Sequence, residues 1–127
     1  MSVGICEALQ SDRLVDITTV GRRSGAPHRL ETVFHVLDGC VYLTGRPGKR
    51  DWYANMLADP GFSFHLKQSA KADISARATP ITDPEQRRRI LPTLVERMGR
   101  SADLDRWLAA SPLVQVALDV DCPELKR

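Results

Sequence analysis

Three runs rich in β-branched residues lie in the first third of the chain, and they constrain the fold more than any other feature of the sequence. The runs cover 14–20, 28–37 and 40–45. Asp-Gly at 38–39 indicates a tight hairpin between the last two runs. The central run carries apolar side chains on both alternating faces, so we expect both of its faces to be covered. The region therefore predicts an antiparallel meander of three strands.

The rest of the sequence alternates between short helices and strands. Periodicity and turn signals predict helices at 51–58, 84–98 and 101–111 and strands at 62–67, 72–81 and 113–120. We expect Asp51, Asp83 and Ser101 to cap the helices and Pro92 to kink the second helix. The order β-β-β-α-β-β-α-α-β excludes a doubly wound parallel sheet. It predicts a mainly β fold with α-helices, in which about six antiparallel strands close into a small barrel with the helices outside.

Length and composition predict a single globular domain over residues 1–127. Apolar residues make up 43% of the chain and charged residues 27%, which excludes a disordered protein. The net charge of +2 is too small to indicate nucleic-acid binding. No apolar run reaches the roughly 18 residues of a membrane span, and the amino terminus lacks the pattern of a signal peptide.

Three cysteines, Cys6, Cys40 and Cys122, occur without the spacing of zinc ligands. Because their number is odd, we expect no disulfide framework, no metal site and a reduced, cytoplasmic setting. The three histidines are also expected to be ordinary, partly buried side chains rather than metal ligands.

The first candidate binding segment is GRRSGAPHR at 21–29. It holds three arginines, a hydroxyl and glycine-flanked backbone N–H groups, which suit an anionic oxygen ligand such as phosphate. A solvated hairpin turn with the same glycines is the alternative. The candidate binding residues are Arg22, Arg23, Ser24, Gly25 and Arg29.

The second candidate segment is TGRPGKRDWYANML at 44–57, where cations and glycines come directly before a helix. A helix amino terminus preceded by such residues favours an anion, whereas a solvated connection is the alternative. Antiparallel pairing places this segment and the first at the same end of the barrel, which favours a joint anion site. The candidate residues are Gly45, Arg46, Gly48, Lys49 and Arg50.

The helix that follows begins with two aromatic residues and an asparagine. Trp52 and Tyr53 are either core anchors or a border for a flat ring system, and Asn55 can hydrogen-bond a carbonyl group. No catalytic acid is evident, and Tyr53 and solvent are the only candidates. The basic run 87–89 is interpreted as a solvated helix face or as a second contact for an acidic ligand tail.

TTVGRRSGAPHR followed by TGRPGKRDWYANMLADP resembles the deazaflavin-dependent nitroreductase family, also called the F420H2-dependent quinone reductase family. The resemblance extends from about residue 14 to 120, and it implies a split β-barrel of the kind that binds FMN. It also implies binding of coenzyme F420, a deazaflavin with a phosphate and a polyglutamate tail. Nine residues carry over by position: Arg22, Ser24, Arg29, Gly45, Gly48, Lys49, Trp52, Tyr53 and Asn55.

The activity implied by this resemblance is hydride transfer from reduced F420 to a quinone, a nitro compound or a similar electron-poor small molecule. A homodimer is also implied, because split-barrel relatives build their site across such an interface. The sequence departs from the family pattern at 30–32, before Trp52 and at 104–111, so the substrate is not inherited. FMN is the alternative cofactor. A non-catalytic flavin or deazaflavin carrier or sensor is the alternative function.

Overall fold

The computed structural model describes residues 4–126, and its strands form a closed antiparallel barrel. Around the barrel the strand order is β1-β2-β3-β6-β5-β4, and every neighbouring pair is antiparallel. This confirms the predicted fold class. The strands are β1 (Leu14–Val20), β2 (Pro27–Leu37), β3 (Cys40–Thr44), β4 (Gly61–Leu66), β5 (Ala72–Pro80) and β6 (Leu113–Leu118).

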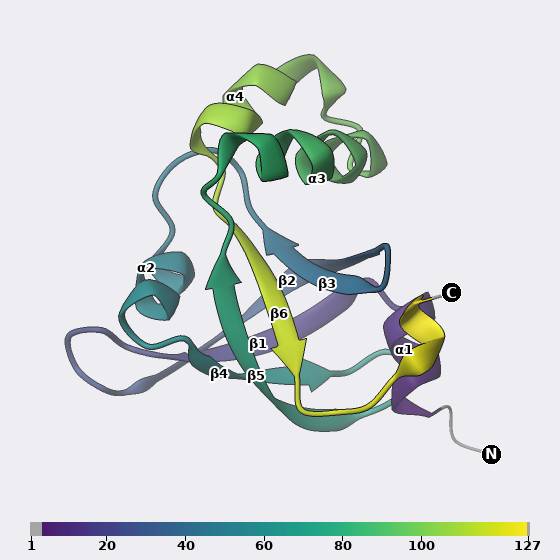
Figure 1. Ribbon diagram of the computed structural model, residues 1–127. Coiled ribbons are helices and arrows are strands. Elements are labelled where there is room, and N and C mark those ends of the chain that lie inside the picture. The colour runs from purple at the N-terminus through teal and green to yellow at the C-terminus, as the bar shows by residue number, and fades with distance from the viewer. Residues whose placement is uncertain (1–3, 127) are drawn as a thin grey trace.

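The helices lie outside the barrel, as predicted (Figure 1). The helices α3 and α4 lie together above one end of the barrel, α2 lies beside it, and α1 lies at the opposite side near the carboxy terminus. No helix in the described part of the chain is long and apolar enough to cross a membrane. The helices are α1 (Ile5–Ser11), α2 (Asp51–Ala58), α3 (Pro84–Arg97) and α4 (Leu104–Ala110), with 3-10 turns η1 (Ser101–Asp103) and η2 (Pro123–Lys126).

Local capping explains both ends of α3. The side chain of Asp83 accepts a hydrogen bond from the N–H of Gln86 at 3.0 Å, as expected of the predicted cap. At the other end Gly99 has φ 69°, and the N–H of Arg100 donates to the carbonyl of Val95 at 2.9 Å. This is a Schellman arrangement, which satisfies the last carbonyls of a helix.

Two predicted helix caps are wrong. Asp51 is the first residue of α2 rather than its cap, and the capping position is held by Arg50 without a side-chain bond. Ser101 begins the 3-10 turn η1, so α4 starts three residues later than predicted. In both cases the chain enters the helix from a segment that other contacts fix, and no side-chain cap is needed to place it.

Two apolar clusters hold the fold together. The first fills the barrel with inward side chains from all six strands and includes the fully buried Ile17, Leu43 and Phe64. The second lies between the outer surface of the barrel and the helices α3 and α4. Its members are Tyr42, Ile81, Leu91, Leu94, Val95, Trp107 and Leu113. This second cluster fixes α3 and α4 over the end of the barrel.

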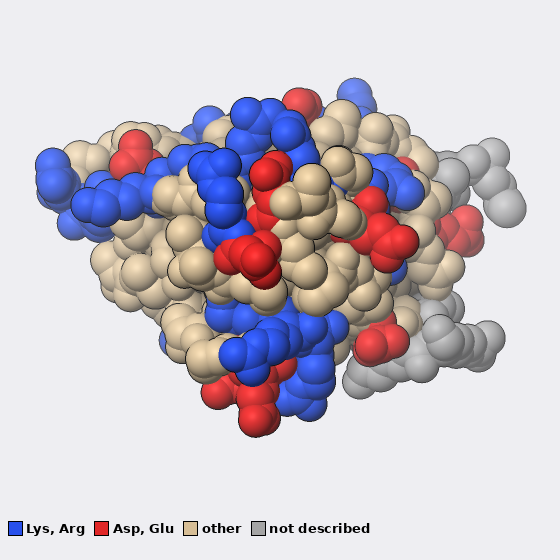
Figure 2. All heavy atoms as spheres, turned by 90° about the horizontal axis from the view of Figure 1, so that it is seen from above, with Lys and Arg blue, Asp and Glu red and all other residues tan. Residues whose placement is uncertain are grey.

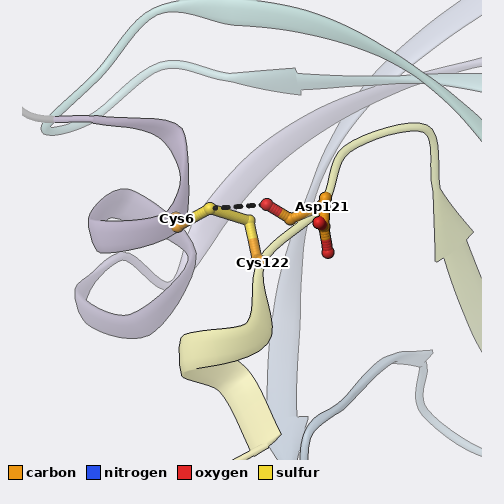
Figure 3. Close-up of a disulfide and its surroundings, with 3 residues drawn as sticks. All are labelled: Cys6, Asp121 and Cys122. Carbon is orange, nitrogen blue, oxygen red and sulfur yellow. Dashed lines mark hydrogen bonds between the residues drawn. A yellow bond between two sulfur atoms is a disulfide. The ribbon is translucent and has the colours of Figure 1, made fainter.

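A disulfide joins the two ends of the described chain (Figure 3). Cys6 on α1 and Cys122, next to η2, are bonded with their Cα atoms 5.4 Å apart, although 116 positions separate them in sequence. The expectation of a chain without disulfides is therefore wrong. Pairing depends on the distance between the cysteines in the folded chain, which the odd cysteine count does not report. The third cysteine, Cys40, is free.

Candidate functional site

The loop between β1 and β2 is closed by its own backbone. The N–H of Gly21 donates to the carbonyl of Ala26, and the N–H of Gly25 donates to the carbonyl of Gly21, both at 2.8 Å. At Gly21 a Cβ atom would lie 2.7 Å from Nε2 of His28 and 2.8 Å from Oγ of Ser24, so a larger residue requires these two side chains to move. The segment predicted to bind an anion is thus a compact turn with exposed arginines.

Arg22 connects this turn to α2. Oδ1 of Asn55 accepts one bond from the N–H of Arg22 at 3.2 Å and another from its guanidinium at 2.8 Å. The same guanidinium contacts Asp51 at 3.2 Å. Nδ2 of Asn55 donates to Oγ1 of Thr19 on β1 at 3.1 Å, and the Asn55 side chain is buried. Asn55 therefore links β1, the loop and α2, and its oxygen is already occupied by Arg22.

A cleft of about 500 Å³ opens between the loop and the start of α2, and we call it the loop cleft. It brings six of the predicted first-segment and helix residues together, whereas Gly25, Tyr53 and the five predicted residues at 45–50 do not line it. Its lining residues are Thr19, Gly21, Arg22, Arg23, Ser24, His28, Arg29, Leu30, Asp51, Trp52 and Asn55. Donor groups and an aromatic side chain therefore share one concave surface.

The three arginines of the loop cleft differ in how far their charge is balanced. Arg22 pairs with Asp51, and Arg29 pairs with Asp16 at 3.1 Å. Hydrogen bonds from Lys67 and Arg29 hold the pKa of Asp16 below its ordinary value, so this carboxylate stays charged. Arg23 has no carboxylate partner among the side chains that the structure describes. Arg23 is thus the loop-cleft cation most available to an anionic ligand.

Trp52 and Tyr53 take different positions on α2. Trp52 is buried in the barrel cluster, yet it also lines the loop cleft. Tyr53 packs edge-to-face on Trp52, with ring centroids 6.0 Å apart, and is half-buried. The aromatic pair therefore anchors α2 to the barrel, and Trp52 alone borders the cleft.

The loop part of the second predicted segment (44–57), residues 45–50, connects β3 to α2. The N–H of Gly48 donates to the carbonyl of Ala110 at the end of α4, at 3.1 Å. A second cleft of about 270 Å³ opens beside it, and we call it the arginine cleft. Its lining residues are Arg46, Pro47, Arg50, Arg100, Asp103, Arg106 and Trp107. Lys49 is exposed and lines neither of these two clefts.

The two clefts lie on either side of the start of α2. Arg50, the residue before the helix, lines the arginine cleft, and Asp51, its first residue, lines the loop cleft. The pairing of β2 with β3 ends at Phe34, opposite Leu43. The pairing of β2 with β1 continues seven residues farther toward the loop, as far as Pro27. That is about 23 Å of extended chain. The two segments therefore leave the barrel at the same end, as predicted, but the long hairpin separates them (Figure 1).

Sequence reasoning missed half of the arginine cleft. Arg100 and Arg106 come from the turn after α3 and from α4, at least fifty positions away from Arg46 and Arg50. The local signal was only a basic residue after the helix-ending Gly99 and another before Trp107. Their convergence depends on how α3 and α4 pack on the barrel.

The basic run at 87–89 was also misread in part. Arg87 is not a solvated side chain, because its guanidinium donates to the carbonyls of Ile81, Trp107, Leu108 and Ser111 at 2.7–3.0 Å. Burial lowers the pKa of Arg87 from its ordinary value. Its neighbours Arg88 and Arg89 are exposed. Arg87 thus fixes the carboxy-terminal end of α4 against α3.

His35 is the histidine with the least satisfied environment. It is 4% exposed, and its Nε2 has no hydrogen-bond partner. Burial, with smaller contributions from Arg97 and Arg13, lowers the pKa of His35 to about 4, so the imidazole is neutral at pH 7. His35 lines a third cleft, of about 440 Å³, which also includes Arg46 and Arg100. We call it the His35 cleft.

The other two histidines have polar surroundings. His65 contacts Asp73 through Nδ1 at 2.6 Å and Thr18 through Nε2 at 2.7 Å, and it thereby links β4, β5 and β1 on the outside of the barrel. His28 is exposed and lines the loop cleft. Among the described residues, no group of three His, Cys, Asp or Glu side chains is placed to hold a metal ion.

Residues 1–119 match the family described as F420H(2)-dependent quinone reductase. The chain belongs to that family. This confirms the resemblance carried by the two glycine-rich basic segments and the Trp-Tyr-x-Asn helix. No curated protein matches the sequence.

Solved structures agree with this family assignment at the level of the fold. The conserved hypothetical protein Rv2991 from Mycobacterium tuberculosis superposes with a TM-score of 0.71 at 22% identity, over 91% of this chain and 79% of that one. HutZ, a heme storage protein from Vibrio cholerae, superposes with a TM-score of 0.69 at 18% identity, over 95% of this chain and 93% of that one. An FAD-binding protein, mll6688, from Mesorhizobium loti superposes with a TM-score of 0.66 at 14% identity, over 94% of this chain and 93% of that one. This member of the F420H(2)-dependent quinone reductase family thus has the fold of a split barrel.

Proposed function

We propose that this protein is an oxidoreductase that binds reduced coenzyme F420 in the loop cleft. In this proposal it delivers reducing equivalents to a quinone, a nitro compound or a similar electron-poor small molecule. The observation that carries the proposal is the composition of the loop cleft, in which hydrogen-bond donors lie beside an aromatic wall. Family membership supports the choice of a deazaflavin over other anionic, flat ligands. The whole chain then serves as one cofactor-binding domain.

The residues of the loop cleft fit the chemistry of the cofactor. The guanidinium of Arg23 and the hydroxyl of Ser24 are donors suited to a phosphate. Oγ of Ser24 accepts from the N–H of Ala26 at 3.1 Å, so its own proton can point toward a ligand. Trp52 and Leu30 supply an apolar surface of the kind that a tricyclic ring needs. We assign cofactor binding to these four residues.

In this proposal Arg22 and Asn55 act indirectly, through the residues that they position. Their hydrogen bonds fix the loop relative to α2, and this sets the position of Arg23 and Ser24. Gly25 permits the turn, with φ 72°. Arg29 contributes a charge that Asp16 partly balances. Arg22, Asn55 and Gly25 are therefore positioning residues rather than direct partners of the cofactor.

The cofactor supplies a hydride when it is reduced and bound, and the protein's task is to bind, orient and shield it. Tyr53 packs against Trp52 and does not line the loop cleft. We therefore assign Tyr53 a packing role and take solvent as the source of the proton that the acceptor needs.

We also propose that the protein works as a homodimer. Val20 and Leu57 are the exposed large apolar side chains among the described residues, at 37% and 56% exposure. Val20 immediately precedes the loop, and Leu57 lies on α2 two positions after Asn55. A second copy that covers these side chains would therefore contact both the loop and α2. Sedimentation of the chain and of its Val20→Ser/Leu57→Ser variant tests this: we expect a dimer and a monomer, respectively.

The activity is tested by mixing the protein anaerobically with reduced F420 and menadione. We expect the absorbance of the reduced cofactor to be lost at a rate proportional to protein concentration, and we expect Arg23→Gln to slow it. Turnover with reduced FMN but not with reduced F420 would reassign the cofactor. Tight binding of F420 without turnover would overturn the enzyme in favour of a carrier or sensor.

A further inference from the structure

We propose that the arginine cleft and the adjoining His35 cleft form a binding site for a small organic anion with more than one carboxylate. The two clefts share Arg46, Arg100 and Trp107, so they are neighbouring parts of one depression. Neither cleft shares a lining residue with the loop cleft, which places the site apart from Arg23.

The first argument is charge. The arginine cleft is lined by Arg46, Arg50, Arg100 and Arg106 and by a single acidic side chain, Asp103. None of these five side chains forms an ion pair with another described side chain. Three positive charges are therefore left unbalanced around a space of about 270 Å³. Like charges gathered this closely repel one another, and a multivalent anion relieves that repulsion.

The surface view agrees with this distribution. Figure 2 looks down on the end of the molecule that carries α3 and α4, and Lys and Arg side chains form separate groups there, with acidic groups between them. The positive charge is thus concentrated locally and is not a continuous band. A net charge of only +2 for the whole chain fits a small anion better than a nucleic acid.

The second argument is that the backbone holds the arginines in place. The N–H of Gly48 bonds to the carbonyl of Ala110, which ties the segment carrying Arg46 and Arg50 to α4. Arg100 occupies the second position of the Schellman turn after α3, and its N–H is bonded to Val95. A ligand that binds here does not have to order the backbone first, so less of its binding energy is lost.

The third argument is the unpartnered nitrogen of His35. Buried polar atoms are nearly always hydrogen-bonded, and the few exceptions require an explanation. Nε2 of His35 has no partner, and the residue lines a cleft together with Arg46 and Arg100. This nitrogen is itself buried, so a polar group of a ligand completes its hydrogen bond only when the wall of the cleft moves aside. The apolar part of such a ligand would contact Met98 and Trp107.

This inference goes beyond the proposed function, because the two clefts lie apart from the loop cleft and the anion is not the hydride acceptor. The binding site itself can be tested without cofactor. Citrate serves as the probe because it carries three carboxylates, and acetate serves as the monovalent comparison. Titration calorimetry at low salt measures the affinities for citrate and for acetate. The proteins compared are the wild-type chain, the Arg100→Gln/Arg106→Gln variant and the Arg88→Gln/Arg89→Gln variant. The last variant removes the same charge from the exposed face of α3, outside both clefts.

We expect citrate to bind the wild-type chain with a Kd below about 1 mM. The Arg100/Arg106 variant should lose at least about tenfold in affinity, and the Arg88/Arg89 variant less than about twofold. Binding should also shift the ¹⁵N resonance of Nε2 of His35, because this nitrogen gains a partner. Equal losses in the two double variants, or no saturation by citrate, would overturn the site.

A final measurement distinguishes a ligand that binds independently of the cofactor from the acidic tail of the cofactor itself. We expect citrate to bind equally well in the presence of saturating F420. Displacement of citrate by F420 would assign the arginines to the cofactor tail and overturn the inference. Failure of F420 to bind, with citrate binding intact, would instead sink the proposed function and leave the anion site standing.

Discussion

Oδ1 of Asn55 accepts hydrogen bonds from both the backbone N–H and the guanidinium of Arg22, at 3.2 Å and 2.8 Å. This relationship joins the glycine-rich basic loop to the Trp-Tyr-x-Asn helix. The two motifs are separated in sequence by β2 and β3, yet one amide oxygen connects them directly. The loop cleft exists because these two elements are held together.

Asn55→Ala is expected to destabilise the fold and to weaken cofactor binding. The substitution leaves the N–H of Arg22 without its acceptor and removes the bond to Thr19 from a side chain that is 3% exposed. We expect a loss of about 2 kcal/mol in the free energy of unfolding, measured by urea denaturation. Asn55→Asp keeps the acceptor and serves as the matched control. An alanine variant as stable as the wild type would contradict the linking role.

Arg87→Met tests whether this arginine fixes α4. The guanidinium satisfies four backbone carbonyls, three of them at or just beyond the end of α4. We expect the variant to lose about 3 kcal/mol in thermal or chemical denaturation. Arg88→Met, at the next, exposed position, should change stability by less than about 0.5 kcal/mol. Equal effects would show that Arg87 is solvated after all.

The barrel was predictable because its signals are local. Alternating β-branched runs and the Asp-Gly turn specify strands and hairpins within a few residues. Arg87 was misread because nothing near it in sequence reports that α4 packs against α3. Arg100 and Arg106 were missed for the same reason, since they meet Arg46 only in the folded chain. Helix α1 has seven residues and no side-chain cap, so its sequence carries no strong helix signal.

The disulfide predicts a large dependence of stability on reduction. A bond between Cys6 and Cys122 closes a loop of more than a hundred residues. The chain-entropy model assigns about 4 to 5 kcal/mol to a loop of that length. We expect Cys6→Ser/Cys122→Ser to lower the free energy of unfolding by several kcal/mol and to abolish the effect of a reducing agent. Cys40→Ser, which removes the free thiol, should change neither the free energy of unfolding nor the effect of the reducing agent.

The lowered pKa of His35 predicts that the free energy of unfolding decreases as the pH is lowered. Its pKa is about 4 in the folded chain and about 6.5 when unfolded, so the unfolded state takes up the proton first as the pH falls. Stability should be constant above about pH 7 and should decrease by about 2 to 3 kcal/mol down to about pH 4.5. His35→Gln should flatten this part of the profile. An unchanged slope in the variant would show that other groups cause it.

The central claim is that the loop cleft binds F420, and an equilibrium titration of F420 and FMN side by side tests it most directly. The account predicts a Kd for F420 below about 100 μM. It also predicts weaker binding of FMN, and about a tenfold loss of F420 affinity in Arg23→Gln with no change in Arg88→Gln. Failure of F420 to bind in that range, or equal affinity in the two variants, would contradict it.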